Sequence, residues 1–212
     1  LVGSEMCIRD SIESMQKYDG ELSFISGNHD SFRIADFLND EELRLAYLFI
    51  YTMPGVPYLF AGDELGQKTN RNLTSKEGGY QRTGTRIPMV FDNTENRGFS
   101  KCKDVSKLYL PIDNETVSVM EQLEDKNSLL NFIKELIKIR KSEDDLRSKD
   151  FKLLDKPLAY SRGKIKVFIN LKDEDQKFEV ESGEILLSVG KVEFSAGKLV
   201  LKKHQAVIFK EA

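Results

Sequence analysis

Two short apolar runs early in the chain each lead directly into a group of polar residues. The first run, residues 22–27, precedes the polar stretch 28–33, and the second, residues 56–60, precedes the acidic stretch 62–64. Continuous apolar runs of this length, bounded by turn residues, are typical of buried strands. The sequence therefore predicts two buried strands, each with a polar tip at its carboxyl end.

The residues between these two runs predict a helix. Asn39 or Asp40 can cap its start, its body is apolar nearly all round, and Pro54 with Gly55 ends it. The resulting order is strand, polar tip, helix, strand, polar tip. A parallel barrel presents its chemistry in this way, at the carboxyl ends of its strands.

A long irregular stretch, residues 66–126, follows and is rich in Gly, Asn, Thr and Pro. A connection of that length is rarely filler in a compact domain. The clearest helix of the chain comes next, capped by Asn127 or Ser128 and ending near residues 140–142, with apolar positions at helical spacing.

After about residue 150 the hydrophobic pattern changes to a period of two, which predicts an antiparallel β-sandwich-like domain of six to eight strands. Charge concentrates between Lys141 and Asp150, where we expect the boundary. The predicted strands are residues 164–171, 177–180, 184–188, 191–194, 198–202 and 206–209.

The part before this boundary contains only two predicted strands and two substantial helices. Two such units cannot close a barrel, so the chain is interpreted as the carboxyl-terminal portion of something longer. The fold class is thus α/β plus all-β. We expect the last part of a (β/α)8 TIM barrel over residues 11–145 and an antiparallel β-sandwich over residues 146–212.

Residues 1–10 are expected to be unstructured or foreign to the protein, because they resemble translated sequencing-adapter sequence; the alternative is an ordinary helix end. They have no basic region and no long apolar core, so they do not form a signal peptide.

The composition does not indicate a nucleic-acid-binding or a membrane-spanning protein. The 212 residues are 40% hydrophobic and carry a net charge of −3, with no basic patch for nucleic acid and no apolar run long enough to cross a bilayer. Two cysteines without metal-type spacing indicate no disulfide framework and favour a reducing compartment.

Several groups of residues, in order along the chain, resemble a known family. Residues 28–30 after the first run resemble the last catalytic motif of glycoside hydrolase family 13, the α-amylase family, and residues 55–66 resemble its eighth-strand motif. Residues 85–89 with 96–100 resemble a loop of its α-glucosidase and oligo-1,6-glucosidase branch, and residues 128–141 its eighth barrel helix. The final strand, residues 205–209, is similar to the end of its β domain.

The resemblance implies retaining cleavage of α-glucosidic bonds in short α-glucans or oligosaccharides. The nucleophile Asp and the acid Glu of the family would both lie before Ser11, so the chain alone is expected to be inactive. No cofactor, metal, nucleic acid or membrane is expected, and a cytoplasmic location suits this branch. The alternatives are a trehalose synthase-like isomerase or transglycosylase, and a non-catalytic binding or scaffold subunit.

Asp30 matches the third carboxylate of the family, which stabilises the transition state; the alternative is an Asx-turn or capping residue. His29 matches a residue that donates to sugar hydroxyls, or it is a loop histidine. Asn28 would orient the strand end.

Arg86 matches an arginine that points into the substrate pocket; the alternative is a loop arginine paired with an acid such as Asp92, and Arg82 is a weaker candidate. Arg33 would pair with Asp30, shape the pocket, or lie on the surface.

Asp63 and Glu64 are adjacent at a strand tip, so at most one can face the sugar. The resemblance implies that this motif mostly supports the loop, and both are therefore interpreted as structural. The chain departs from the branch in having Val90 and Phe91 where Gln-Trp is usual, and it has no Trp. Either Phe91, Tyr80 or Tyr58 supplies the aromatic face, or this loop does not contact the sugar. The departure leaves the preferred linkage and chain length open.

Overall fold

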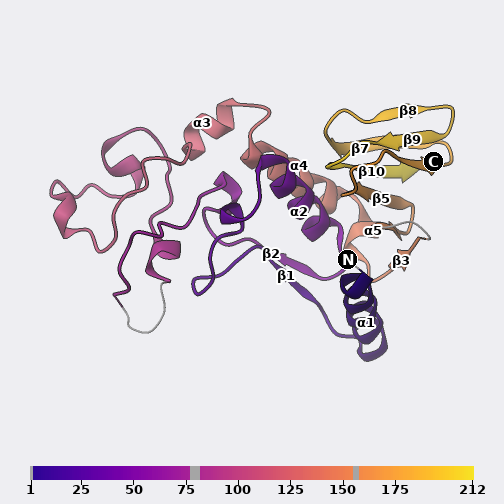
Figure 1. Cartoon of the computed structure of the whole chain (residues 1–212), viewed down its shortest axis with the longest axis horizontal. Helices are drawn as coiled ribbons and strands as arrows, with labels where there is room; N and C mark the ends of the chain where they lie inside the picture. Colours follow the sequence, from indigo (N-terminus) through magenta and orange to yellow (C-terminus); the bar gives the residue numbers. More distant parts are fainter. Residues whose placement is uncertain (1, 77–81, 155–157) are drawn as a thin grey trace. The chain divides into compact units, whose positions relative to one another are not determined.

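The computed structural model describes residues 2–76, 82–154 and 158–212 (Figure 1). The chain divides into two compact units, which are described separately. Unit 1 comprises residues 1–24, 44–57 and 136–212, and unit 2 comprises residues 25–43 and 58–135. This division differs from the predicted domains, because parts of both central helices belong to the same unit as the carboxyl-terminal sheets.

The two predicted helices are confirmed, and local capping explains where they begin. α2 (Asp40–Thr52) follows Asn39, whose Oδ1 accepts from the Glu42 amide at 3.0 Å while Glu42 Oε2 accepts from the Asn39 amide at 3.0 Å. This reciprocal pair is a capping box. α4 (Leu129–Ser142) follows Ser128, whose hydroxyl accepts from the Asn131 amide at 3.2 Å.

A further helix, α1 (Val2–Tyr18), occupies most of the segment that the sequence predicts to be unstructured or foreign. Ile12 and Met15 on this helix are both 3% exposed. The origin of residues 1–10 stays a prediction.

Strands β1 (Ser23–Ile25) and β2 (Val56–Tyr58) lie where the two apolar runs predict them and pair in a two-stranded sheet. The Val56 amide donates to the Leu22 carbonyl at 2.7 Å, and the Ser26 amide donates to the Tyr58 carbonyl at 3.0 Å. This order of partners makes the two strands parallel.

The predicted burial of these strands is wrong for this chain. Ile25, Val56 and Tyr58 are 54%, 41% and 55% exposed. An apolar run predicts burial only if other elements cover both faces of the strand, and that condition depends on residues far from the run itself.

The carboxyl-terminal part of unit 1 contains two antiparallel sheets, which confirms the predicted change to β structure. One sheet has the order β3-β4-β5-β10-β7 and the other has the order β6-β9-β8. Their bounds are β3 (Lys152–Leu153), β4 (Ala159–Arg162), β5 (Ile165–Asn170), β6 (Gln176–Glu179), β7 (Gly183–Val189), β8 (Glu193–Ser195), β9 (Lys198–Leu201) and β10 (Gln205–Glu211).

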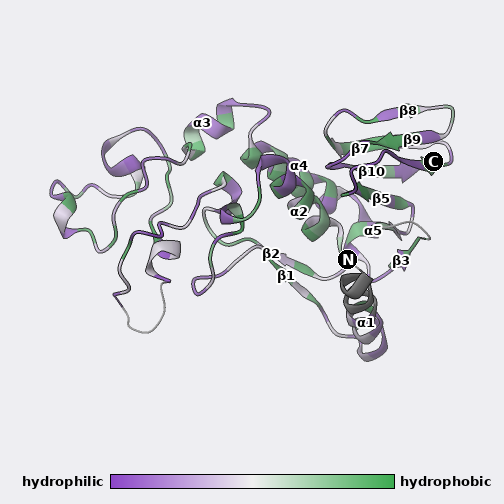
Figure 2. Cartoon of the chain, viewed as in Figure 1, coloured by the Kyte–Doolittle hydropathy of each residue, from purple (hydrophilic) through white to green (hydrophobic). Residues whose placement is uncertain are grey.

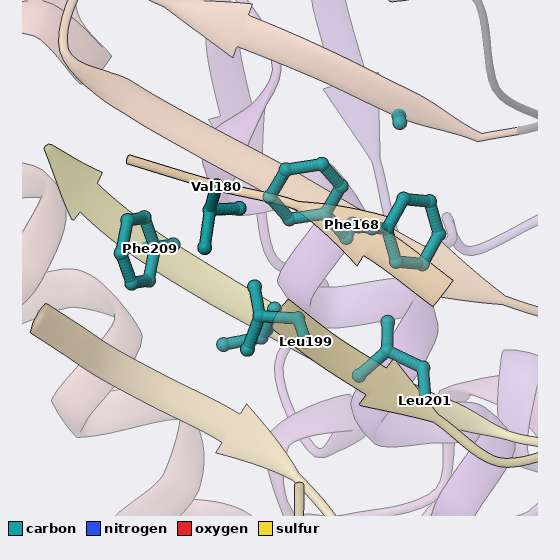
Figure 3. Close-up of a cluster of buried hydrophobic side chains, with 8 residues drawn as sticks. Phe168, Val180, Leu199, Leu201 and Phe209 are labelled. Atoms are coloured by element: carbon teal, nitrogen blue, oxygen red, sulfur yellow. The ribbon is translucent and has the colours of Figure 1, made fainter. Parts of the chain in front are cut away.

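A hydrophobic cluster joins the two sheets (Figure 3). Phe168 of β5 and Phe178 of β6 contact each other with ring centroids 4.7 Å apart, and Phe209 of β10 is fully buried. The other buried members are Ala159, Val180, Leu199, Leu201 and Val207. Hydrophobic positions are also concentrated on α2, α4 and β5 in Figure 2, so each of these elements has an apolar surface to bury.

Unit 2 contains the long irregular stretch, which is built from short helical turns and loops. Within this stretch these are η3 (Thr83–Arg86), η4 (Glu95–Gly98), η5 (Val105–Lys107) and α3 (Val119–Glu124), and η1 (Ile34–Asp36) and η2 (Asp63–Leu65) precede it. α3 has a capping box between Ser118 and Glu121, and Gln122 Nε2 donates to the Leu65 carbonyl at 3.0 Å. Side-chain bonds of this kind order the stretch in place of long regular elements.

The short helix α5 (Asp144–Arg147) completes the elements. Within the described ranges, none of the helices has the length and apolar character that a membrane crossing requires.

Candidate functional site

Asp30 lies in unit 2, five residues beyond the end of β1, and three basic side chains surround its carboxylate. Arg82 Nη1 donates to Oδ1 at 2.8 Å and Arg86 Nη2 donates to the same oxygen at 3.0 Å. His29 Nε2 lies 3.3 Å from Oδ2. The Asp30 side chain is still 48% exposed, so it can be reached from solvent.

The turn that carries Asp30 is made by a different residue. Asn28 Oδ1 accepts from the Asp30 amide at 2.8 Å, which is the geometry of an Asx-turn. Asn28 thus orients the strand end, as the sequence predicts, and the Asp30 carboxylate is not used as the turn acceptor. Its bonds go to arginine side chains instead.

The surroundings of Asp30 favour its ionised form. Partial desolvation alone would raise the pKa of Asp30, but the charges of Arg82 and His29 and hydrogen bonds from both arginines lower it below its ordinary value. A carboxylate with a lowered pKa is fully ionised at neutral pH. The site therefore holds an ionised, accessible carboxylate that is paired with two arginines.

Arg86 bridges two of the predicted site residues. Besides its bond to Asp30, its Nε donates to the His29 carbonyl at 3.0 Å. The alternative partner Asp92 accepts instead from the amide and the hydroxyl of Thr94, at 2.8 and 2.6 Å. The structure thus brings Asp30, His29 and Arg86 together, as expected from the sequence.

Arg82 has a larger place in the site than the sequence indicates. It precedes η3, whose single turn carries Arg86 at its end, so both guanidinium groups reach one carboxylate. Gly84 between them lies where a Cβ would be 1.9 Å from the Asn70 carbonyl oxygen, so glycine is required for this turn to pack. Two arginines flanking Thr-Gly-Thr is the signal that could have identified Arg82.

Arg33 lies apart from the exposed cluster. It is 2% exposed, and its guanidinium donates to Asp63 Oδ1 at 2.8 Å, to the Ala61 carbonyl at 3.0 Å and to the Thr85 carbonyl at 3.2 Å. The predictions that it pairs with Asp30 or lies on the surface are therefore wrong in this structure. Its buried charge is paired with the carboxylate of Asp63.

The two acidic residues after β2 have structural contacts, as predicted. Asp63 is fully buried, and burial raises its pKa against the opposing effects of Ser26 and Arg33. Glu64 Oε2 accepts from the Gly62 amide at 2.8 Å.

Of the aromatic residues considered for sugar contact, Tyr58 and Phe91 are 55% and 44% exposed, and Val90 is buried. Tyr80 lies outside the described residues. In the parts of the chain that the structure describes, no three His, Cys, Asp or Glu side chains are grouped to hold a metal ion.

Comparison with protein families identifies the class. The model of the alpha-amylase catalytic domain matches residues 5–149. The chain belongs to the alpha-amylase family, and the resemblance seen in the sequence is confirmed.

Individual relatives agree with this assignment. Glucan 1,6-alpha-glucosidase of Streptococcus pneumoniae is 29% identical over 88% of this chain and 41% of its own length. Trehalose synthase of a Pimelobacter species is 32% identical over 53% of this chain and 20% of its own length. The chain therefore spans less than half the length of the curated relatives it matches.

A solved structure shows the same fold. Trehalose-6-phosphate hydrolase of Bacillus licheniformis superposes with a TM-score of 0.77 and 19% identity, over 96% of this chain and 45% of that chain. The mixed helical and sheet structure described above thus has a counterpart of the same fold among solved structures.

Proposed function

We propose that this chain is the carboxyl-terminal portion of a retaining α-glycoside hydrolase that cleaves α-glucosidic bonds in short oligosaccharides. The observation that carries the proposal is the accessible, ionised Asp30 at the tip of β1, with Arg86, Arg82 and His29 on its two oxygens. The family assignment and the glucosidase relative support it.

Retaining cleavage passes through a transition state with positive charge on a flattened sugar ring. A carboxylate that binds the sugar hydroxyls more tightly in that geometry accelerates the reaction, because only interactions that strengthen in the transition state lower the barrier. Asp30 has the charge and the accessibility for this role. His29 and Arg86 are positioned beside it to bind substrate hydroxyls.

The nucleophile and the general acid are proposed to come from a part of the protein that precedes this chain. In this proposal β1 and β2 are the last two strands of a (β/α)8 barrel, over residues 11–145, and residues 146–212 form a β-sandwich. The parallel order of β1 and β2, and the cluster that joins the two antiparallel sheets, support this arrangement.

The test is to sequence the DNA upstream of codon 11 in the source genome and to express the longer protein. It should release glucose from maltose or isomaltose with retention of the anomeric configuration, which NMR of the first product detects. Asp30→Asn should lower kcat by about 10²–10³-fold, the usual cost of losing one electrostatic stabiliser. Asp92→Asn is the matched control, because Asp92 is a half-buried loop carboxylate that accepts from the amide and the hydroxyl of Thr94.

The 212-residue chain alone should show no turnover, because in this proposal the two other carboxylates belong to the preceding part of the protein. If the upstream DNA encodes no nucleophile Asp or no acid Glu, the proposed enzymatic function is contradicted. The alternative of a binding or scaffold subunit then remains.

A second candidate is an isomerase or transglycosylase, which the trehalose synthase relative favours. The same carboxylates can pass the sugar to water or to another hydroxyl, so product analysis separates the two. Trehalose from maltose would indicate isomerisation, and glucose alone would indicate hydrolysis. The substrate partners in either case are α-glucosides, and cell fractionation would test the proposed cytoplasmic location.

A further inference from the structure

One buried carboxylate holds both ends of the segment that carries Asp30. The Ser26 hydroxyl, at the start of residues 26–33, donates to Asp63 Oδ2 at 2.7 Å. Arg33, at the end of the same segment, donates to Asp63 Oδ1 at 2.8 Å. Each oxygen of one side chain therefore holds one end of the loop that presents His29 and Asp30.

The same pair also reaches the segment that carries Arg86. Arg33 Nε donates to the carbonyl of Thr85, the residue just before Arg86, at 3.2 Å. The Thr85 hydroxyl donates to the Ser31 carbonyl, next to Asp30, at 3.0 Å. The segment that carries Asp30 and the segment that carries Arg86 are thus both hydrogen-bonded to the buried pair of Asp63 and Arg33.

Close packing restricts the movement of the Asp63 and Arg33 side chains. Asp63 is fully buried and Arg33 is 2% exposed, and the Arg33 guanidinium lies 4.7 Å from the centre of the Phe60 ring. A Cβ at Gly27 would be only 3.1 Å from Asp63 Oδ2, so the loop backbone approaches the carboxylate closely there. Buried groups with several hydrogen bonds of this kind hold a geometry that exposed ion pairs do not.

We propose that Asp63, together with Arg33, is a positioning pair that fixes where Asp30 and Arg86 meet. The pair touches no substrate and acts through the loop ends and the Thr85 carbonyl. Its effect on catalysis rests on the proposed function, whereas its effect on the geometry of the loop does not.

The first experiment measures the loop geometry in the 212-residue chain. The chain has two histidines, so isotope labelling of histidine gives two sets of ring signals, which His204→Gln assigns. His29 reports the position of Asp30, because its Nε2 lies 3.3 Å from that carboxylate. Asp63→Asn should shift and broaden the His29 signals and leave those of His204 unchanged.

Glu64→Gln is the matched control, since Glu64 is the adjacent carboxylate and accepts from the Gly62 amide alone among its described contacts. Its His29 signals should be those of the unsubstituted chain. If Asp63→Asn prevents folding, Ser26→Ala decides the matter, because it releases one end of the loop and keeps the ion pair. Unchanged His29 signals in a folded Asp63→Asn or Ser26→Ala chain would overturn the proposal.

The second experiment uses the longer protein. Asp63→Asn should lower kcat and kcat/KM together by about 10²-fold, the cost of a displacement of about 1 Å, with KM nearly unchanged. A merely structural role would lower the melting temperature and leave kcat per folded molecule unchanged, which would also overturn the proposal. An inactive unsubstituted protein would contradict the proposed function, and the His29 signals would still decide the positioning role.

Discussion

Two arginines are buried in the part of the chain whose burial the structure describes, and they differ in the groups that accept their hydrogen bonds. Arg33 in unit 2 is paired with the carboxylate of Asp63. Arg162 on β4 in unit 1 is fully buried, and within the described residues its guanidinium donates only to main-chain carbonyls. These belong to Thr52, Leu146, Ser148 and Asp150.

The difference separates two uses of the same side chain. Burial, together with the nearby charge of Arg140, lowers the pKa of Arg162 to about 10, so its charge persists at neutral pH without a bonded carboxylate. It connects the end of α2 to the segment after α4 through backbone acceptors. Arg33 instead forms an ion pair, and its partner Asp63 is the group whose pKa is displaced.

The largest effect on stability is expected from Arg162→Met. Each buried acceptor left unpaired costs about 1–3 kcal/mol, so losing several should lower the free energy of unfolding by roughly 4 kcal/mol or more. Urea unfolding of the 212-residue chain measures this. The matched control is Arg147→Met, whose side chain is 54% exposed and whose substitution should cost within about 0.5 kcal/mol. A loss for Arg162→Met as small as for this control would show that water replaces the guanidinium.

Arg33→Met should cost nearly as much at pH 7, about 3–5 kcal/mol, because it leaves the Asp63 charge buried without a partner. The two arginines should then differ in pH dependence. The loss for Arg33→Met should shrink toward pH 5, since Asp63 can take up a proton, and the loss for Arg162→Met should not change over that range. Equal pH dependence of the two variants would contradict the distinction between them.

The comparison also shows what the sequence can predict. α2 and α4 were predictable because their caps and periodicity are local, as Asn39 and Glu42 illustrate. β3 and β4 were not identified individually, because they are short and lack a clear alternation. The exposure of β1 and β2 could not be predicted from their apolar residues, since covering elements decide it.

Partners in the site follow the same rule. The contact between Arg33 and Asp63 joins residues 30 positions apart, and that between Arg86 and Asp30 joins residues 56 apart. No local pattern specifies either pair. Asp30 and Arg86 were expected in one substrate pocket only because residues 28–30 and 85–89 resemble family motifs. The contact between Arg33 and Asp63 was missed because no motif names the partner of Arg33.

A smaller effect on the free energy of unfolding is expected when Asp63→Asn is compared with the unsubstituted chain at different pH values. The pKa of Asp63 is raised on folding, mainly by burial, so the folded chain binds this proton more tightly than the unfolded chain. Its contribution to stability is therefore present below the ordinary pKa of Asp and is lost as the pH rises through the raised value. The unsubstituted chain should lose stability relative to Asp63→Asn over this range, by at most about 1.4 kcal/mol per pH unit. The opposite slope in urea titrations would contradict the raised pKa.

The smallest effect on stability is expected from Asp30→Asn, although this variant should have the largest effect on catalysis. The ion pairs of Asp30 join side chains that are 48%, 30% and 23% exposed, and pairs so open to solvent contribute little to folding. The unfolding midpoint should therefore equal that of the unsubstituted chain. The small effect of Asp30→Asn on stability and the large effect of Arg33→Met would then distinguish Asp30, which is held in position, from the Arg33–Asp63 pair that holds it. A clear fall in the midpoint would mean instead that Asp30 has a structural role, in which it connects the loop at residues 82–86 to the end of the strand.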